Sequence, residues 1–119
     1  MLKLSESQRA ALASDRVAQF HARGVAHLRG RYPRETAQTT DADLRTLLDA
    51  AITRGKPWRV TSEFDVLRLS ECLLLHGPDF AVTEAFTWAR HILRRDDLTG
   101  RQKMTAIADY EAFHAGVSR

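Results

Sequence analysis

The apolar positions of the chain recur at intervals of three and four residues, the spacing that places side chains on one face of a helix. No segment alternates between apolar and polar residues as a half-buried strand does. The pattern therefore predicts an all-α fold, built as a compact single-domain bundle of about five helices. We expect these helices near residues 6–31, 42–54, 63–76, 83–95 and 100–115.

Capping and breaking residues mark the ends of these helices. Four of them begin with a hydroxyl residue three positions before an acceptor side chain, a spacing that lets side chains satisfy the first backbone N–H groups. Three of them end at a proline, which is poorly accommodated inside a helix. The starts are Ser5-x-x-Gln8, Thr40-x-x-Asp43, Ser62-x-x-Asp65 and Thr99-x-x-Gln102, and the stops are Tyr32-Pro33, Gly55-Lys56-Pro57 and Gly77-Pro78.

The first predicted helix has an apolar face bordered by arginines. Glycine inside a helix costs roughly 1 kcal/mol relative to alanine, so Gly24 on this face predicts a close crossing with another helix. Arg9, Arg16 and Arg23 recur every seven residues along the flank, with His27 beside them. We interpret this basic flank as one candidate partner-binding surface, with a solvated helix face as the alternative. The apolar face consists of Ala10, Ala13, Val17, Phe20, Gly24 and Leu28.

The helix near 63–76 is apolar nearly all round its axis. A helix that is apolar on every side is usually surrounded by others, so we expect this helix to be the central one. Its apolar residues are Phe64, Val66, Leu67, Leu69, Leu73, Leu74 and Leu75.

The last helix carries two separate apolar stripes. Met104, Ile107 and Ala108 form one of them, and a second stripe lies well round the cylinder. One stripe can pack on the core, and the other then has no obvious cover. An exposed aromatic patch is typical of a protein interface, with covering loops as the alternative. The second stripe contains Ala106, Tyr110, Phe113 and Val117, of which the last three are our second candidate partner-binding surface.

Length and charge narrow the class of protein. A chain of 119 residues has room for one domain, 1–119, and little else. The net charge is +3, but residues 1–59 hold eleven basic against six acidic residues, whereas residues 60–119 hold seven against nine. A basic front half favours an acidic partner or nucleic acid. Nucleic-acid binding is the weaker of these, because no short turn joins a pair of recognition helices and few aromatics interleave with the basic residues.

The sequence contains cysteine and histidine, but not in the combinations that form catalytic or metal-binding sites. Cys72 is the only cysteine, so no intrachain disulfide can form, and its apolar surroundings disfavour a thiolate. None of the five histidines forms a His-x-x-x-His pair or a His-Glu-x-x-His motif. Nucleophile elbows, calcium loops and Gly-rich phosphate loops are also missing from the sequence. The sequence therefore predicts a protein that is not an enzyme and holds no metal and no cofactor.

The apolar runs are too short for a membrane segment. Residues 1–9 are polar and do not resemble a signal peptide. The longest apolar run is Cys72-Leu73-Leu74-Leu75, whereas a spanning helix needs about 20 residues. We therefore expect a cytoplasmic protein that does not enter a membrane.

Two stretches of the chain carry a family resemblance. The first is Phe20-His-Ala-Arg-Gly-Val-Ala-His-Leu28 with Tyr32-Pro33, and the second runs from Val60-Thr-Ser-Glu-Phe-Asp-Val66 through Leu69, Leu73 and Gly77-Pro-Asp-Phe80 to Trp88-Ala89 and Ile92-Leu93. Together they resemble the small helical proteins encoded beside type VI secretion effectors in Gram-negative bacteria, near spike-tip PAAR or Rhs proteins. The chain departs from this pattern at Arg59-Val60, where Gly-Ile is usual, and at Ala81, where an acidic residue is common.

The resemblance implies an accessory, co-chaperone-like role in the bacterial cytoplasm. Such a protein is a non-catalytic adaptor that binds an adaptor chaperone or the toxin effector itself, and assists loading of the effector onto the secretion spike. Two alternatives stay open: an immunity protein that neutralises a neighbouring toxin, and a nucleic-acid-associated helical regulator. The residues that match are interpreted as fold determinants; they include Phe20, Leu28, Phe64, Leu73, Gly77, Phe80, Trp88 and Ile92.

Overall fold

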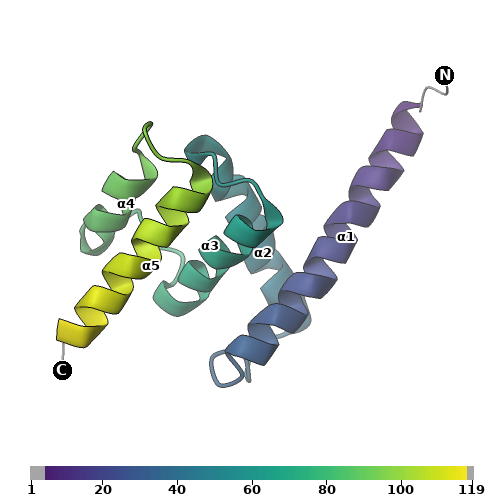
Figure 1. Cartoon of the computed structure of the whole chain (residues 1–119). Coiled ribbons are helices and arrows are strands. Elements are labelled where there is room, and N and C mark those ends of the chain that lie inside the picture. Colours follow the sequence, from purple (N-terminus) through teal and green to yellow (C-terminus); the bar gives the residue numbers. More distant parts are fainter. Residues whose placement is uncertain (1–4, 118–119) are drawn as a thin grey trace. The chain divides into compact units, whose positions relative to one another are not determined.

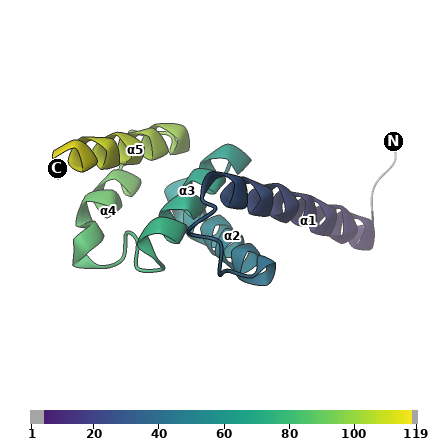
Figure 2. The same cartoon turned by 90° about the horizontal axis from the view of Figure 1, so that it is seen from below.

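The computed structural model describes residues 5–117, with side chains described through His114. This part of the chain forms five α-helices and two short 3₁₀ helices, with no strand among them (Figures 1 and 2). The all-α prediction is therefore confirmed. The elements are α1 (Glu6–Arg31), α2 (Asp41–Gly55), η1 (Lys56–Trp58), α3 (Glu63–His76), η2 (Glu84–Phe86), α4 (Thr87–Leu93) and α5 (Gly100–Val117).

Four of the five helices lie close to their predicted bounds, and the fourth is shorter. The pattern predicted one helix near 83–95, but the structure divides this segment into η2 and the seven-residue α4. Thr83 precedes η2 without a side-chain hydrogen bond to cap it. A short 3₁₀ turn needs no such cap to form, so an apolar periodicity alone could not separate it from an α-helix.

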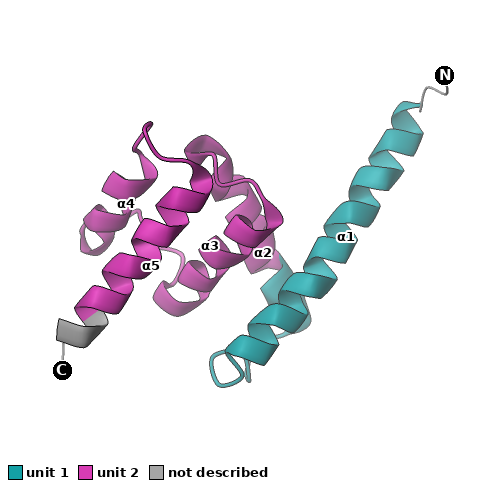
Figure 3. Ribbon diagram, in the orientation of Figure 1, with its two compact units in different colours: residues 1–45 teal, residues 46–119 magenta. Residues whose placement is uncertain are grey.

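The chain divides into two compact units, residues 1–45 and 46–119, which we call the N-terminal and C-terminal units (Figure 3). The boundary falls inside α2, one turn after its first residue. The single domain expected over 1–119 stays a prediction, and each unit is described by itself below.

In the N-terminal unit, α1 begins with a capping box. The Ser5 hydroxyl accepts from the backbone N–H of Gln8, and the Gln8 side chain accepts from the Ser5 N–H at 2.9 Å. This reciprocal pair satisfies two N–H groups that a helix start leaves without a partner, and it typically contributes about 1 kcal/mol. The sequence pattern therefore determines where α1 begins.

The predicted apolar face of α1 is buried only in its C-terminal half. Phe20, Gly24 and Leu28 are buried. The earlier members of the same face, Ala10, Ala13 and Val17, are exposed, and 42% of Val17 is accessible. The sequence could not distinguish the two halves, because the same spacing continues through both.

Arg29 ties the reversal of the chain to the end of α1. Its guanidinium donates to the carbonyl oxygens of Thr36 and Thr39 at 3.0 and 2.8 Å. Its Nε also donates to Asp41 Oδ1 at 2.9 Å, within an ion pair. The buried Thr36 hydroxyl donates to the carbonyl of Tyr32 at 2.8 Å. The turn is thus held by hydrogen bonds, of which those from Arg29 are charge-assisted.

In the C-terminal unit, α5 packs against both α3 and α4. α3 buries one side, including Val66, Leu69 and Leu73. Burying such side chains contributes roughly 1.5–3 kcal/mol each, so the core of this unit is a substantial source of stability. Further core residues are Phe80 after α3, Ala89 and Leu93 of α4, and Met104 and Ile107 of α5.

Phe64 corrects the expectation of a helix buried on every side. Its side chain is 55% exposed, and Leu75 at the other end of α3 is 44% exposed. The Phe64 ring instead lies under two guanidinium groups, those of Arg101 at 4.5 Å and Arg68 at 5.7 Å from its centroid. Cation–π contacts of this kind stabilise an aromatic ring at the surface, so an apolar residue here does not imply a core position.

Among the described residues of this unit, three have a backbone in the left-handed region. Gly77 (φ +87°) ends α3, and its N–H donates to the carbonyl of Leu73 at 2.9 Å. Arg59 (φ 61°) and Ala81 (φ 62°) are the other two. This region disfavours residues with a side chain. Arg59 and Ala81 therefore adopt a backbone that glycine accommodates at lower cost.

Candidate protein-binding surface

The first candidate site is the exposed N-terminal half of α1, which lies beyond the residues that the turn after the helix contacts. The Arg29-centred turn engages only the last turns of α1. Every residue of α1 from Glu6 to Gln19 is exposed. We call Ala10, Ala13 and Val17 the open α1 face. They belong to the same apolar stripe as Phe20, Gly24 and Leu28, which are buried further along the helix.

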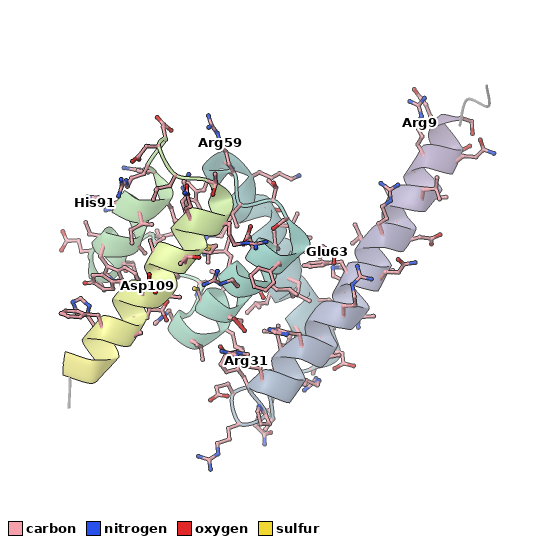
Figure 4. All side chains as sticks on the ribbon, viewed as in Figure 1. Arg9, Arg31, Arg59, Glu63, His91 and Asp109 are labelled. Atoms are coloured by element: carbon pink, nitrogen blue, oxygen red, sulfur yellow. The ribbon has the colours of Figure 1, made fainter. Side chains whose placement is uncertain are left out.

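Basic side chains border the open α1 face. Arg9, Arg16 and Arg23 are all exposed, and Figure 4 shows Arg9 projecting from the N-terminal part of α1. Seven residues of helix rise about 10 Å, so these charges form a row beside the apolar positions. His27, which the sequence analysis grouped with them, is exposed on the same flank.

A shallow depression runs along α1 and includes Ala13 and Val17 of the open α1 face. One part, about 360 Å³, is lined from Ala13 to His21, and a second part, about 450 Å³, is lined from Ala18 to Arg29. Asp41 and Arg45 at the start of α2 complete the second part, so the whole depression belongs to the N-terminal unit. Its open form suits a protein side chain or helix better than an enclosed small ligand.

The later arginines of the basic front half have structural roles, which sequence reasoning missed. Arg29 holds the turn, as described above. Arg31 donates to the Tyr32 hydroxyl at 3.3 Å and lies over the Tyr32 ring. Helical periodicity carries no signal for either contact, because both partners lie at or beyond the end of α1.

The second candidate surface, on α5, is partly covered. Tyr110 stacks on Trp88 of α4, with ring centroids 4.0 Å apart, and on His114 at 3.8 Å. Phe113 is 67% exposed and touches only the edge of His114 among the rings. The predicted patch is thus reduced mainly to Phe113. The side chain of Val117 lies outside the described residues.

One cluster of chemical groups was not predicted. Cys72 and His76 lie one turn apart on α3, and Glu111 of α5 lies between them. The Cys72 Sγ is 3.7 Å from Glu111 Oε1, and His76 Nε2 is 3.6 Å from Glu111 Oε2. The spacing of Cys72 and His76 on one predicted helix was visible in the sequence, but their pairing with Glu111 depends on how α5 packs on α3.

This cluster does not activate its thiol. Burial raises the pKa of Cys72 well above its ordinary value, and the charge and hydrogen bond of Glu111 raise it further. A nucleophilic cysteine needs a neighbouring base or positive charge that favours the thiolate. The carboxylate beside Cys72 has the opposite effect. His76 instead stacks on Phe80, with ring centroids 5.4 Å apart, which is a packing role.

Two further buried charges hold the C-terminal unit together. Asp65 is buried and accepts from Arg101 Nε at 2.7 Å and from the Ser62 hydroxyl at 2.7 Å. Lys103 is buried, and its Nζ donates to the carbonyl of Trp58 at 2.8 Å. Burial lowers the pKa of Lys103, and the nearby charge of Arg59 acts in the same direction. Both groups have protein partners, so they act as internal ties.

Metal binding and membrane spanning have no counterpart in the described part of the chain. Within residues 5–117, no three His, Cys, Asp or Glu side chains are grouped so that they could hold a metal ion. In the same part of the chain, none of the helices combines the length and apolar character needed to span a bilayer.

No family model, curated protein or solved structure matches the chain. The resemblance to accessory proteins of type VI secretion therefore rests on the residues quoted for it in the sequence.

Proposed function

We propose that this protein is a non-catalytic adaptor that binds another protein through the open α1 face. The observation that carries the proposal is the divided face of α1, buried at Phe20, Gly24 and Leu28 but exposed at Ala13 and Val17. A heptad-spaced apolar stripe that continues beyond its own cover is a typical docking site for a partner helix.

Energetics support a partner on this half of α1. An isolated helical segment is marginal in water, because few of its residues gain stability from burial. The capping box at Ser5 starts the helix, but the exposed residues that follow contribute little apolar burial. Docking of an amphipathic helix would bury Val17 and the alanines beside it and so stabilise both segments.

The resemblance suggests which partner to test first. Small helical proteins beside type VI secretion effectors act as co-chaperones, so the proposed partner is the adaptor chaperone or the toxin effector encoded nearby. In this role the protein assists loading of the effector and performs no chemistry itself. An immunity protein is the alternative, and gene deletion separates the two, because loss of immunity poisons the cell whereas loss of a co-chaperone only stops effector delivery.

The experiment is co-purification from the native bacterium, combined with a secretion assay. Ala13→Asp with Val17→Asp places two carboxylates on the open α1 face, and we expect loss of the neighbouring chaperone or effector and loss of effector secretion. The matched control is Ala11→Asp with Gln19→Asp, two exposed positions on other sides of the same helix. Equal capture by both variants, with circular dichroism unchanged, would show that this face is not the docking site.

A further inference from the structure

The charges around the open α1 face point to the chemistry of its partner. In heptad notation with Ala10 and Val17 at positions a, Ala13 and Phe20 occupy positions d. The preceding g positions are then Arg9, Arg16 and Arg23, all arginine and all exposed. Residues at e and g lie beside the apolar seam of paired helices, and they set which partner is accepted.

The flank on the other side of the face carries no acidic residue. The e positions beside the seam are Ser14, His21 and Leu28. The only acidic residues of α1 are Glu6, at the d position that precedes the open face, and Asp15, at the f position away from the seam. The open α1 face is therefore an apolar stripe with a basic border on one side.

This arrangement argues against a second copy of the chain as the occupant. An antiparallel copy would place the g-position arginines of both chains opposite each other, and like charges at these positions repel. A parallel copy would place the arginines opposite Ser14 and His21, which offer no negative charge. Neither arrangement gives complementary pairs.

We propose that the occupant is an acidic amphipathic helix of another protein, with Asp or Glu recurring every seven residues beside its apolar stripe. The inference rests on the proposed adaptor function and specifies the partner of the same surface. Two matching carboxylates would pair with Arg9 and Arg16, which lie about 10 Å apart along the helix. The pairs steer the partner and determine its register, while the apolar contacts supply most of the affinity.

A membrane surface fits the observations less well. The open face presents two alanines and Val17, with no aromatic or long apolar side chain on the face itself. Helices that lie in a lipid interface insert bulky residues such as Trp, Phe or Leu. Binding to anionic vesicles is accordingly an outcome that the test must distinguish.

The experiment uses the full chain and two designed peptides of four heptads, with leucine at a and d. One peptide carries glutamate at every e and g position, and the other carries lysine. Each repels its own copies, so both are available for binding. Fluorescence anisotropy should show the glutamate peptide binding at least about tenfold more tightly, with the preference shrinking from about 50 to about 500 mM NaCl as screening increases.

Charge reversal locates the effect on the chain. Arg9→Glu with Arg16→Glu should weaken the glutamate peptide by about tenfold and strengthen the lysine peptide. The control is Arg34→Glu with Arg94→Glu, which makes the same change of net charge at two exposed arginines outside α1. It should keep affinity for the glutamate peptide within about twofold of the unmodified chain.

The possible outcomes separate this inference from the proposed function. Equal binding of both peptides, or equal losses in the two double variants, overturns it. A dimer that Val17→Asp dissociates overturns it in favour of a second copy, and binding to anionic vesicles without binding to the glutamate peptide overturns it in favour of lipid. If the native partner is still lost from Ala13→Asp with Val17→Asp while the glutamate peptide never binds, the adaptor function stands and the acidic helix does not. If a reversed variant does not fold, the two peptides and the salt series on the unmodified chain decide the matter.

Discussion

The two longest helices of the molecule use the same kinds of residue in different ways. α5 packs against α3 and α4, and its Met104 and Ile107 are buried. α1 is longer, yet no residue from Glu6 to Gln19 is buried. In the C-terminal unit, apolar side chains are enclosed by neighbouring helices and charges such as Asp65 have internal partners. In α1 from Glu6 to Gln19, the apolar residues and the arginines are both exposed.

The difference indicates a division of labour between stability and recognition. Core residues of α3 and α5 lower the free energy of the folded state directly through burial. Exposed residues of α1 contribute little to it, so their spacing is free to serve another molecule. Substitutions should therefore act on folding in one region and on binding in the other.

The sharpest test of this comparison is a pair of truncations. Leu73→Ala in α3 removes a buried side chain and should lower the free energy of unfolding by about 2–5 kcal/mol. Val17→Ala on the open α1 face should change it by less than about 0.5 kcal/mol. Urea denaturation followed by circular dichroism measures both. Comparable losses would mean that Val17 is enclosed in solution and that the open α1 face is covered by other parts of the chain.

The pH dependence of stability tests the packing of Cys72 in the C-terminal unit. Its pKa is raised in the folded state, so above the ordinary thiol pKa of about 8.5 the unfolded chain loses a proton that the folded chain keeps. Stability is fully present below that pH and falls above it, by at most about 1.4 kcal/mol per pH unit. Urea titrations of the unmodified chain and Cys72→Ala, between about pH 7.5 and about pH 10, should show a steeper decline only in the former. Parallel curves would place the thiol in water.

The two aromatic residues that the sequence grouped together should differ. Tyr110→Ser breaks the stack with Trp88 and His114, and we expect a loss of about 1–2 kcal/mol. Phe113→Ser removes an exposed ring, so the loss should stay below about 0.5 kcal/mol. Thermal unfolding distinguishes them. A larger loss for Phe113→Ser would mean that the Phe113 ring is enclosed in solution.

The most local effect is expected at the start of α1. Ser5→Ala removes the capping box and should weaken the first turn by about 1 kcal/mol. Hydrogen exchange read by mass spectrometry should speed up in the first turns of α1 while α3 stays unchanged. Faster exchange in both helices would show that α1 and the C-terminal unit unfold together, so that α1 would contribute to the stability of the core.

Sequence patterns anticipated local features better than contacts between elements. The capping residues Ser5 and Ser62 predicted the starts of α1 and α3, because a cap depends on residues three positions apart. Phe64 was expected in the core and is exposed, because the arginine that covers its ring comes from α5. Tyr110 was expected at the surface and is half-buried, because Trp88 comes from α4.

For the candidate site, too, the sequence predicted the local features of one helix and not the contacts between elements. The heptad row of Arg9, Arg16 and Arg23 beside an apolar stripe is a property of one helix, and the sequence alone determined it. Which part of the stripe is buried was decided only by the tertiary structure, as was the use of Arg29 in the turn that follows. Helical periodicity shows which residues share a face. Whether that face is buried depends on segments that are distant in sequence, and the spacing of residues within one helix carries no information about them.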